Sequence, residues 1–276
     1  MVDFKQKDFY DVADLREIVR LLRAPGGCPW DIEQTHESIR RNFLEEAYEV
    51  AEAIDEKNPD HLREELGDVL LQVLFHTQIE EEAGRFTINE VADGVSKKLI
   101  FRHPHVFGDR AVAGTGEVLS NWEELKREEK GQATHSDAVA SVARSLPALW
   151  RAEKIQQKAK KAGFDWPDVS GAMDKLKEEL GELQGAVNGR GNPVEELGDL
   201  LFAAVNVSRF LPCDPEEALG AACDKFTRRF ALVEEGAKQQ GSAMEALSLA
   251  QLDELWDAAK AADAHKPFPD TNPGTP

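Results

Sequence analysis

Two short acidic patterns in this 276-residue sequence have the residue types and spacing to bind a metal ion. Glu46 and Glu49 form an ExxE pattern, and Glu65 and Asp68 form an ExxD pattern within the segment EELGD at 64–68. Residues three apart on an α-helix lie about 60° apart around its axis, so each pair shares one face. Carboxylates from two facing helices, without His or Cys at ligand spacing, favour Mg²⁺, with Mn²⁺ as a substitute.

The same two patterns recur in the second half of the sequence. EELGD is repeated identically at 195–199, and a second ExxE pattern lies upstream of it. Such self-similarity indicates a tandem duplication. We therefore predict two metal sites, with ligands Glu46, Glu49, Glu65 and Asp68 in the first repeat and Glu179, Glu182, Glu196 and Asp199 in the second.

Apolar residues near these acids bear on the choice between a metal site and an ordinary acidic surface. A single ExxE pattern usually marks a solvated helix face. Here the acids border the apolar stripes around Phe43 and Leu176, and Asp68 and Asp199 directly precede apolar runs, which predicts that they lie near the interior. Uncompensated charge is costly there, and a divalent cation would compensate it. The two aspartates stand where di-iron bundles have histidine, which argues against iron.

A basic cluster follows the second acidic pattern. Lys225 and Arg229 are four residues apart and share a helix face, and Arg228 is next to them. In an acidic protein this cluster is a candidate clamp for a triphosphate. Ion pairs with surface glutamates are the alternative. Hydrolysis would then use a metal-bound water, with Glu178 or Glu179 as the general base.

Helices must position these residues. The apolar residues around the acids recur at helical spacing, and no stretch alternates with the period of two that a strand requires. We predict an all-α protein in which each repeat is a small antiparallel helical bundle. Pro59, Pro193 and Pro215 fall where helices should begin, a position that tolerates proline.

Composition divides the chain into four segments. We predict a first helical repeat over 1–130, a polar linker over 131–145 and a second helical repeat over 146–265. The segment 266–276 contains four prolines and no periodic apolar pattern, so we expect a disordered tail.

The charge and hydropathy of the chain exclude several classes of protein. A formal net charge of −19 opposes binding to nucleic acid. The sequence lacks the apolar run of about 20 residues that a membrane helix needs, and its start does not resemble a signal peptide. Three cysteines without ligand or disulfide spacing suit a reducing compartment. We expect a cytoplasmic protein that binds neither nucleic acid nor membrane.

Several longer motifs resemble those of the MazG family, which belongs to the all-α nucleoside triphosphate pyrophosphohydrolases. The resemblance extends from about Asp14 to Lys260. Its motifs are GGCPWD at 26–31, LEEAYEV at 44–50, RHPHVF at 102–107, RSLPALWRAEKIQ at 144–156 and EELGDLLFA at 195–203.

This resemblance implies an activity and an assembly. It implies cleavage of ribo- and deoxyribonucleoside triphosphates of several bases between the α- and β-phosphates, and a homodimer whose second repeat is active. Trp256 is expected to stack on a base, although it could equally anchor the last helix. The implied nucleotide contacts are Lys175, Leu176, Lys177, Glu178, Glu179, Asn192, Pro193, Val194, Glu195, Lys225, Arg228, Arg229 and Trp256.

Two rival interpretations come from other classes. Arg63, Glu64 and Glu65 resemble part of the Nudix box, but no second acidic pair follows at the required spacing and the Nudix helix belongs to a mixed α/β fold. A helical scaffold with degenerate metal sites would keep the fold without turnover. Release of pyrophosphate from a nucleoside triphosphate separates both rivals from the interpretation above.

Overall fold

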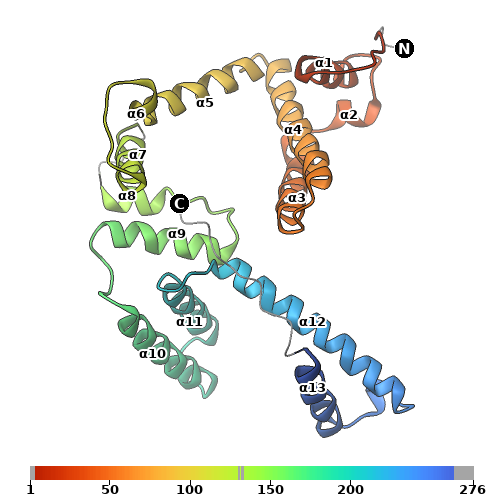
Figure 1. The fold of residues 1–276 in the computed structure, drawn as a ribbon, viewed down its shortest axis with the longest axis vertical. Helices are drawn as coiled ribbons and strands as arrows, with labels where there is room; N and C mark the ends of the chain where they lie inside the picture. The colour runs from red at the N-terminus through yellow and green to blue at the C-terminus, as the bar shows by residue number, and fades with distance from the viewer. Residues whose placement is uncertain (1–3, 130, 132–133, 264–276) are drawn as a thin grey trace. The chain divides into compact units, whose positions relative to one another are not determined.

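Helices are the regular elements of this protein. The computed structural model describes residues 4–129, 131 and 134–263, and no β-strand occurs in these ranges (Figure 1). The prediction of an all-α fold is confirmed. None of the helices in the described ranges is long and apolar enough to cross a membrane. The tail predicted for 266–276 lies outside the described residues.

The chain divides into two units by its internal packing, Met1–Val112 and Ala113–Pro276. The first unit contains α1 (Val12–Arg23), α2 (Pro29–Glu33), α3 (His36–Asp55), α4 (Pro59–Glu82), α5 (Ile88–Arg102) and α6 (Pro104–Phe107). The second contains α7 (Thr115–Glu129), α8 (His135–Ala140), α9 (Ala148–Lys161), α10 (Val169–Val187), α11 (Pro193–Ser208), α12 (Pro215–Gln239), the short 3₁₀ helix η1 (Met244–Ala246) and α13 (Leu249–Asp263).

The predicted boundaries of the repeats differ from the boundary between these units. Helix α7 belongs to the second unit, although the first repeat was expected to extend over 1–130. Helix α8 lies within the expected linker, 131–145. It begins there because Thr134 and Asp137 bond each other's backbone N–H groups with their side chains, each at 3.0 Å. Polar residues that suggest a linker thus also serve as a helix cap.

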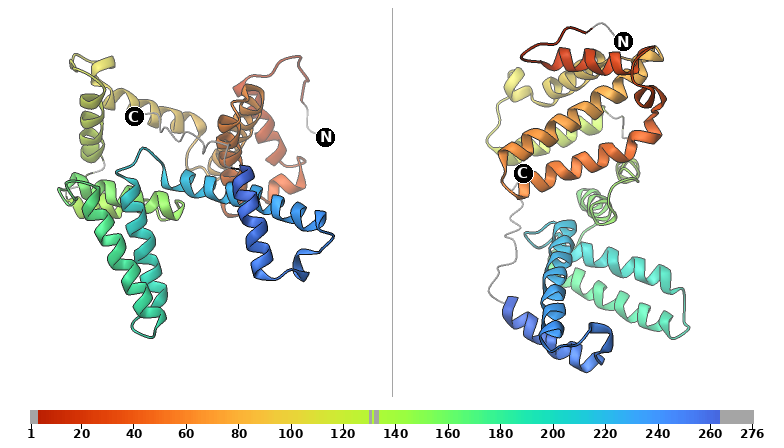
Figure 2. Two further views of the ribbon diagram at one scale, coloured as in Figure 1. Left: turned by 60° about the horizontal axis from the view of Figure 1, so that its bottom comes forward. Right: turned by 90° about the vertical axis from the view of Figure 1, so that its right-hand side faces the viewer.

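Each unit contains one long helical hairpin that carries the acidic patterns. Helices α3 and α4 form the first hairpin and α10 and α11 the second, and in each the two helices lie side by side and antiparallel (Figure 2). The second helix of each hairpin begins at a proline, Pro59 or Pro193, as predicted, and α12 likewise begins at Pro215. This repetition confirms the tandem organisation.

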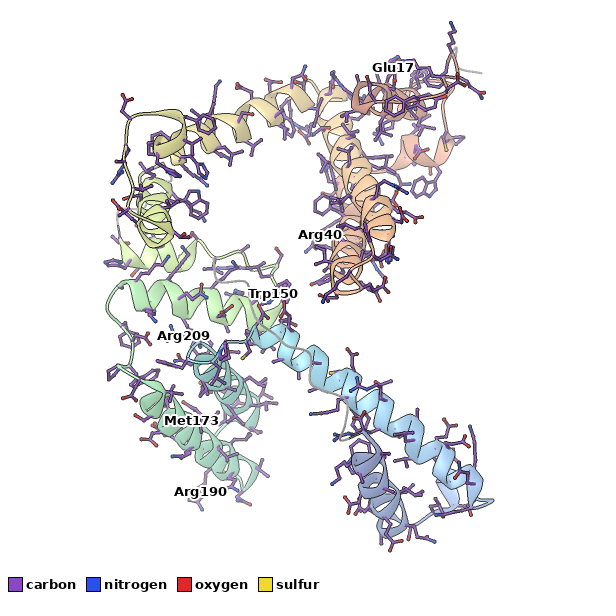
Figure 3. The ribbon with its side chains drawn as sticks, in the orientation of Figure 1. Glu17, Arg40, Trp150, Met173, Arg190 and Arg209 are labelled. Atoms are coloured by element: carbon purple, nitrogen blue, oxygen red, sulfur yellow. The ribbon has the colours of Figure 1, made fainter. Side chains whose placement is uncertain are left out.

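A small apolar core holds the first hairpin against α1. It consists of Val19, Ile39, Leu74 and Phe75, which come from three helices and are at least nine-tenths buried. In the second unit, α9 packs against both α11 and α12. The indole nitrogen of Trp150 on α9 donates to the carboxylate of Asp214, the residue that caps α12, at 2.8 Å (Figure 3). These contacts attach each hairpin to a neighbouring helix at one end.

Much of the apolar surface on each hairpin remains exposed. Ile54 and Leu66 in the first unit are 56% and 51% exposed, and Leu180 and Leu201 in the second are 50% and 51% exposed. Two helices cover only the faces that they turn toward each other, so the outer apolar faces need a further partner to be buried.

Candidate metal and nucleotide site

The turn between α10 and α11 places the acidic patterns of the two helices next to each other. Helix α10 ends in a turn in which Gly189 and Gly191 adopt left-handed conformations, with φ of 88° and 112°. Asn192 then caps α11 by accepting a hydrogen bond from the backbone of Val194 at 3.1 Å. Glycine permits this tight reversal because it has no Cβ. The ExxE pattern of α10 consequently faces the ExxD pattern of α11.

Three carboxylates of the second repeat converge on one point. Glu179, Glu196 and Asp199 each place an oxygen within 4.8 Å of the other two. In the first repeat the corresponding cluster consists of Glu46, Glu49 and Glu65. The structure thus brings together three of the four predicted ligands in each repeat.

The fourth predicted ligand lies outside the compact cluster in each repeat. In the second repeat it is Glu182, and in the first it is Asp68, so different positions of the pattern are absent from the two clusters. Both remain close enough to act electrostatically on the cluster. After burial, the charge of Glu182 is the next largest cause of the raised pKa of Glu196, and the charge of Asp68 is the next largest cause of the raised pKa of Glu46.

The clusters lie less deep than the sequence predicts. Glu65 and Glu179 are buried, at 8% and 5% exposure, but Glu49, Glu182 and Asp199 are exposed. The prediction that Asp199 lies near the interior is wrong, because the apolar face that follows it in α11 is itself partly exposed. One buried glutamate therefore anchors each cluster, and more exposed acids surround it.

Mutual repulsion and burial make protonation of these acids easier. Burial is the largest cause of the raised pKa of Glu196, followed by the charges of Glu182, Glu195 and Asp199. Burial is likewise the largest cause of the raised pKa of Glu46 and of Glu65. Closely spaced carboxylates with raised pKa values form a site that a cation would stabilise.

A lysine distinguishes the two clusters. The Lys175 ammonium lies 2.6 Å from Glu179 and 2.8 Å from Glu178, and these carboxylates raise its pKa. Glu178 itself is exposed and stands outside the cluster. In the first repeat Asn42 occupies the corresponding position, four residues before Glu46. The second repeat therefore has a lysine beside its acids, and lysine is a side chain that commonly binds phosphate.

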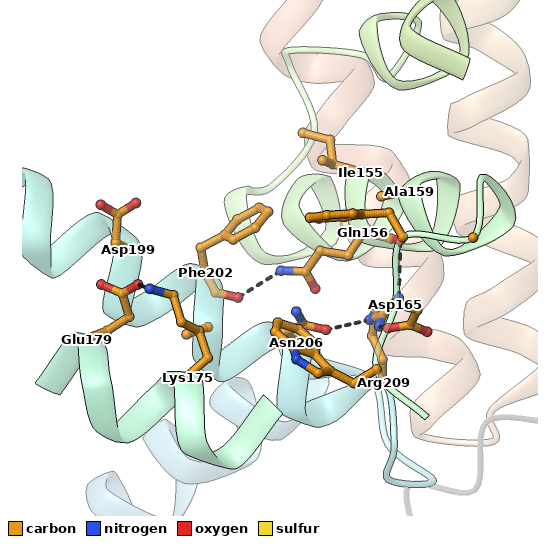
Figure 4. A pocket seen from close by; sticks show the side chains of 14 residues that line it. Ile155, Gln156, Ala159, Asp165, Lys175, Glu179, Asp199, Phe202, Asn206 and Arg209 are labelled. Carbon is orange, nitrogen blue, oxygen red and sulfur yellow. Dashed lines mark hydrogen bonds and ion pairs between the residues drawn. The ribbon is translucent and has the colours of Figure 1, made fainter. Parts of the chain in front are cut away.

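A cavity of about 640 Å³ adjoins the second cluster (Figure 4). It lies between α9, α10 and α11, and Glu179, Asp199 and Lys175 contribute to one part of its wall. The remaining lining consists of Ile155, Gln156, Ala159, Gly163, Phe164, Asp165, Trp166, Phe202, Ala203, Asn206 and Arg209. A volume of this size suits a small organic ligand.

Arg209 holds the walls of this cavity together. It follows the last residue of α11, and its guanidinium donates to the backbone oxygen of Gln156 on α9 at 3.1 Å and to the side-chain oxygen of Asn206 at 2.9 Å. It also forms an ion pair with Asp165, in the loop that leads to α10. One buried cation thus connects α9, α11 and the loop between α9 and α10.

The predicted phosphate clamp lies elsewhere in the second unit. Arg229 and Arg228 lie 3.0 Å and 3.6 Å from the carboxylate of Asp263, whose pKa they lower, Arg229 having the larger effect. Trp256 packs against Phe226, with 5.2 Å between the ring centres. These residues and Lys225 belong to α12 and α13 and do not line the cavity. Their role as nucleotide contacts stays a prediction.

Two amide residues of the cavity were not predicted from the sequence. Gln156 and Asn206 lie on α9 and α11, and neither belongs to an acidic or basic pattern. The available signal was a polar residue on an apolar helix face, since Gln156 is adjacent to Ile155 and three residues before Ala159.

The fold and the site together define a class of protein: a tandem all-helical protein in which each repeat brings three carboxylates close together. A family model described as the MazG nucleotide pyrophosphohydrolase domain matches residues 34–107 and again 154–233. The matched ranges contain both acidic clusters. The chain belongs to the MazG family, and it is an enzyme of the class that hydrolyses acid anhydrides.

Individual relatives extend over most of the chain. A protein of Thermotoga maritima named nucleoside triphosphate pyrophosphohydrolase/pyrophosphatase MazG is 48% identical over 250 residues, which cover 91% of this chain and 96% of that protein. A nucleoside triphosphate pyrophosphohydrolase of Escherichia coli K12 is 44% identical over 251 residues, 89% of this chain and 95% of that one. The uncharacterized protein YabN of Bacillus subtilis is 48% identical, but only 53% of its length is covered.

Proposed function

We propose that this protein hydrolyses nucleoside triphosphates, ribo- and deoxyribo- and with several bases, at the bond between the α- and β-phosphates. The products are a nucleoside monophosphate and pyrophosphate. The observation that carries the proposal is the cluster of Glu179, Glu196 and Asp199 beside a cavity of ligand size, with Lys175 paired to Glu179. The names of the relatives from T. maritima and E. coli support the same substrate class.

The chemistry of the donor set fits Mg²⁺, with Mn²⁺ as a substitute. Three carboxylates that converge without His or Cys are hard oxygen ligands. Glu179, Glu196 and Asp199 would hold the ion, and Glu182 would contribute its charge. When bound, Mg²⁺ supplies positive charge that polarises a phosphoryl oxygen.

The remaining residues of this region bind phosphate and move a proton. Glu178 is outside the cluster and exposed, so of the two predicted bases it is the one free of a ligand role. It accepts the proton of the attacking water in this proposal. Lys175, now paired with Glu178 and Glu179, turns its ammonium toward the phosphates when the nucleotide arrives.

The first repeat is proposed to bind an ion without comparable turnover. Its cluster of Glu46, Glu49 and Glu65 lacks a lysine at the position of Lys175. Instead, the imidazole of His61 lies 3.2 Å from Glu65. A site with fewer positive side chains provides less stabilisation for a triphosphate.

The test measures pyrophosphate release from a nucleoside triphosphate in the presence of Mg²⁺. Glu179→Ala or Asp199→Ala should lower kcat/KM by roughly 100-fold or more, because loss of the ion removes several kcal/mol of transition-state stabilisation. Glu46→Ala is the matched variant of the first repeat, and it should retain much of the activity. Thermal unfolding of each variant shows whether the fold is intact.

Two outcomes contradict the proposal. Release of orthophosphate without pyrophosphate would mean that another bond is cleaved. A greater loss of activity in Glu46→Ala than in Glu179→Ala would assign turnover to the first repeat.

A further inference from the structure

The turn at the end of the second hairpin carries an arginine that is not engaged by the rest of the hairpin. Arg190 lies between α10 and α11, and its side chain is exposed (Figure 3). It forms no ion pair and no side-chain hydrogen bond within the described ranges, whereas the two lysines of the hairpin, Lys175 and Lys177, are both paired with acids. The Arg190 guanidinium is therefore available to a ligand.

The backbone of Arg190 is fixed although its side chain is exposed. Its N–H group donates to the carbonyl oxygen of Gly185 in the last turn of α10 at 2.9 Å, and the N–H group of Gly189 donates to that of Ala186 at 2.9 Å. This pair of bonds closes the helix end and requires the left-handed conformation that Gly189 adopts. The arginine side chain thus starts from a defined position at the end of α10.

This position lies within reach of the acidic cluster. A Cβ added at Gly191 would lie 3.5 Å from Oε1 of Glu196, so the turn approaches one of the three clustered carboxylates. Consecutive Cα atoms are about 3.8 Å apart, which places the Cα of Arg190 at most about 9 Å from that oxygen. An extended arginine side chain covers most of such a distance, so its guanidinium can contact an anion bound at the cluster.

The first repeat differs at this turn in both charge and distance. Each hairpin caps its second helix with an asparagine, and two residues before that cap the first repeat has Glu56 where the second has Arg190. Glu56 is bonded to His61 at 2.9 Å. The first repeat also has three more residues between the cap and EELGD, which amount to about 4.5 Å along a helix. An arginine at a turn next to the acids is thus a feature of the second repeat.

We infer that Arg190 binds the terminal phosphate of the substrate and makes the site selective for triphosphates over diphosphates. The inference rests on the proposed function, which places the triphosphate at the acidic cluster of the second repeat. The cavity adjoins this cluster at Glu179 and Asp199, whereas Arg190 does not line it. A nucleotide that extends from the cavity across the cluster directs its last phosphate toward the turn.

The chemistry of arginine suits this role. Its guanidinium presents N–H donors in a planar fork that pairs with two oxygens of one phosphate group. The terminal phosphate carries the most negative charge of the chain, and the nearby acids repel it unless a cation faces it. A diphosphate ends one phosphate short of the turn, so it gains little from Arg190.

The experiment compares kcat/KM for ATP and for ADP in the presence of Mg²⁺. Arg190→Gln should lower kcat/KM for ATP by about tenfold, mainly through a raised KM, because a charge-assisted hydrogen bond to the γ-phosphate is lost. The value for ADP should change little, so the preference for ATP should fall by about tenfold. Arg190→Lys keeps the charge without the fork and should restore part of the preference.

A matched control comes from the turn of the first hairpin. Lys57 is the exposed cation there, and Lys57→Gln removes the same charge at the greater distance from the acids, so it should leave the ratio unchanged. A second measurement needs no turnover. Calorimetric titration with inorganic pyrophosphate and Mg²⁺ should show about tenfold weaker binding to Arg190→Gln than to the unaltered protein. Thermal unfolding shows whether each variant is folded.

The two levels of proposal fail in different ways. A preference for ATP that Arg190→Gln leaves intact, or unchanged pyrophosphate binding in this variant, would overturn the inference and leave the proposed function in place. If the unaltered enzyme releases no pyrophosphate from any triphosphate, the proposed function fails, and the inference fails with it.

Discussion

The pKa of Glu80 is strongly lowered, although this residue lies outside the acidic cluster of the first unit. It is 8% exposed, and its carboxylate contacts Arg85 at 2.7 Å and His36 at 2.5 Å. Arg85 makes the larger contribution and His36 the smaller to lowering the pKa of Glu80 from 4.5 to about 2. The charged carboxylate thereby helps to attach the end of α4 to the start of α3.

This contact predicts a pH dependence of folding stability. A lowered pKa in the folded state gives stability that is present above pH 4.5 and lost as the pH falls toward about 2. Glu80→Gln should therefore be less stable than the unaltered protein at pH 6, and the difference should shrink between pH 4.5 and pH 2. Urea unfolding at a series of pH values measures it. Arg85→Gln should give the same trend, and a difference independent of pH would contradict this origin.

At this scale the sequence predicted the acids but not their surroundings. The spacing within ExxE and ExxD defines a shared helix face, so the convergence of Glu179 with Glu196 could be predicted. Which acid of each repeat stays outside the cluster depends on the packing of the two helices, which spacing does not specify. Gln156 was missed for a related reason, because only tertiary packing shows that its oxygen is buried and unpaired.

The loop between α9 and α10 packs unusually tightly on the start of α10. A Cβ added at Gly171 would lie 2.2 Å from Cδ1 of Trp166, whose ring lines the cavity. Glycine is required here for the close approach of the ring, not for a special backbone conformation. The position of Trp166 therefore depends on the absence of a side chain one turn into α10.

Replacement of this glycine predicts a change in the cavity. Gly171→Ala should displace the Trp166 ring, raise KM for ATP several-fold, and change kcat less, because the acidic cluster lies further along the hairpin. Gly181→Ala on the same helix is the control for helix propensity. Its Cβ would meet nothing within 4 Å, so it should stabilise the protein by up to about 1 kcal/mol. An unchanged KM in Gly171→Ala would contradict the role assigned to Trp166.

The starts of the helices could be predicted from the sequence better than the boundary between the two units. The helix starts at Pro59, Pro193 and Pro215 followed from the fixed φ of proline, a local property. The division of the chain between its units did not follow from composition, since the polar segment around Thr134 caps a helix. Polar residues such as Thr134 are typical both of linkers and of helix caps, so residue type alone does not distinguish the two.

The exposed apolar surface on both hairpins is relevant to the assembly of the protein. Leu180 on α10 and Leu201 on α11 are about half exposed, as are Ile54 and Leu66 in the first unit. Monomeric proteins rarely leave such faces open to water. These faces support the homodimer that the family resemblance implies, with a second copy as the partner that covers them.

The dimer is testable by sedimentation over a range of protein concentrations. We expect a dimer for the unaltered protein, and Leu201→Asp should raise its dissociation constant by at least about tenfold, because a charge would enter an apolar interface. The helical content measured by circular dichroism should not change. A monomer at all concentrations, or a dimer indifferent to this substitution, would contradict the expectation.

The Arg209 connection has a mechanical consequence. Within one copy of the chain, the second hairpin is held to α9 at its Arg209 end, so it can bend like a lever whose pivot is that end. Asn206 lies close to the pivot, whereas Glu196 lies ten residues away, about 15 Å along α11. Thermal bending displaces a lever least near its pivot. The part of the cavity near Asn206 would thus be stiffer than the acidic cluster, whose carboxylates retain the freedom to follow a phosphate chain as its bonds change.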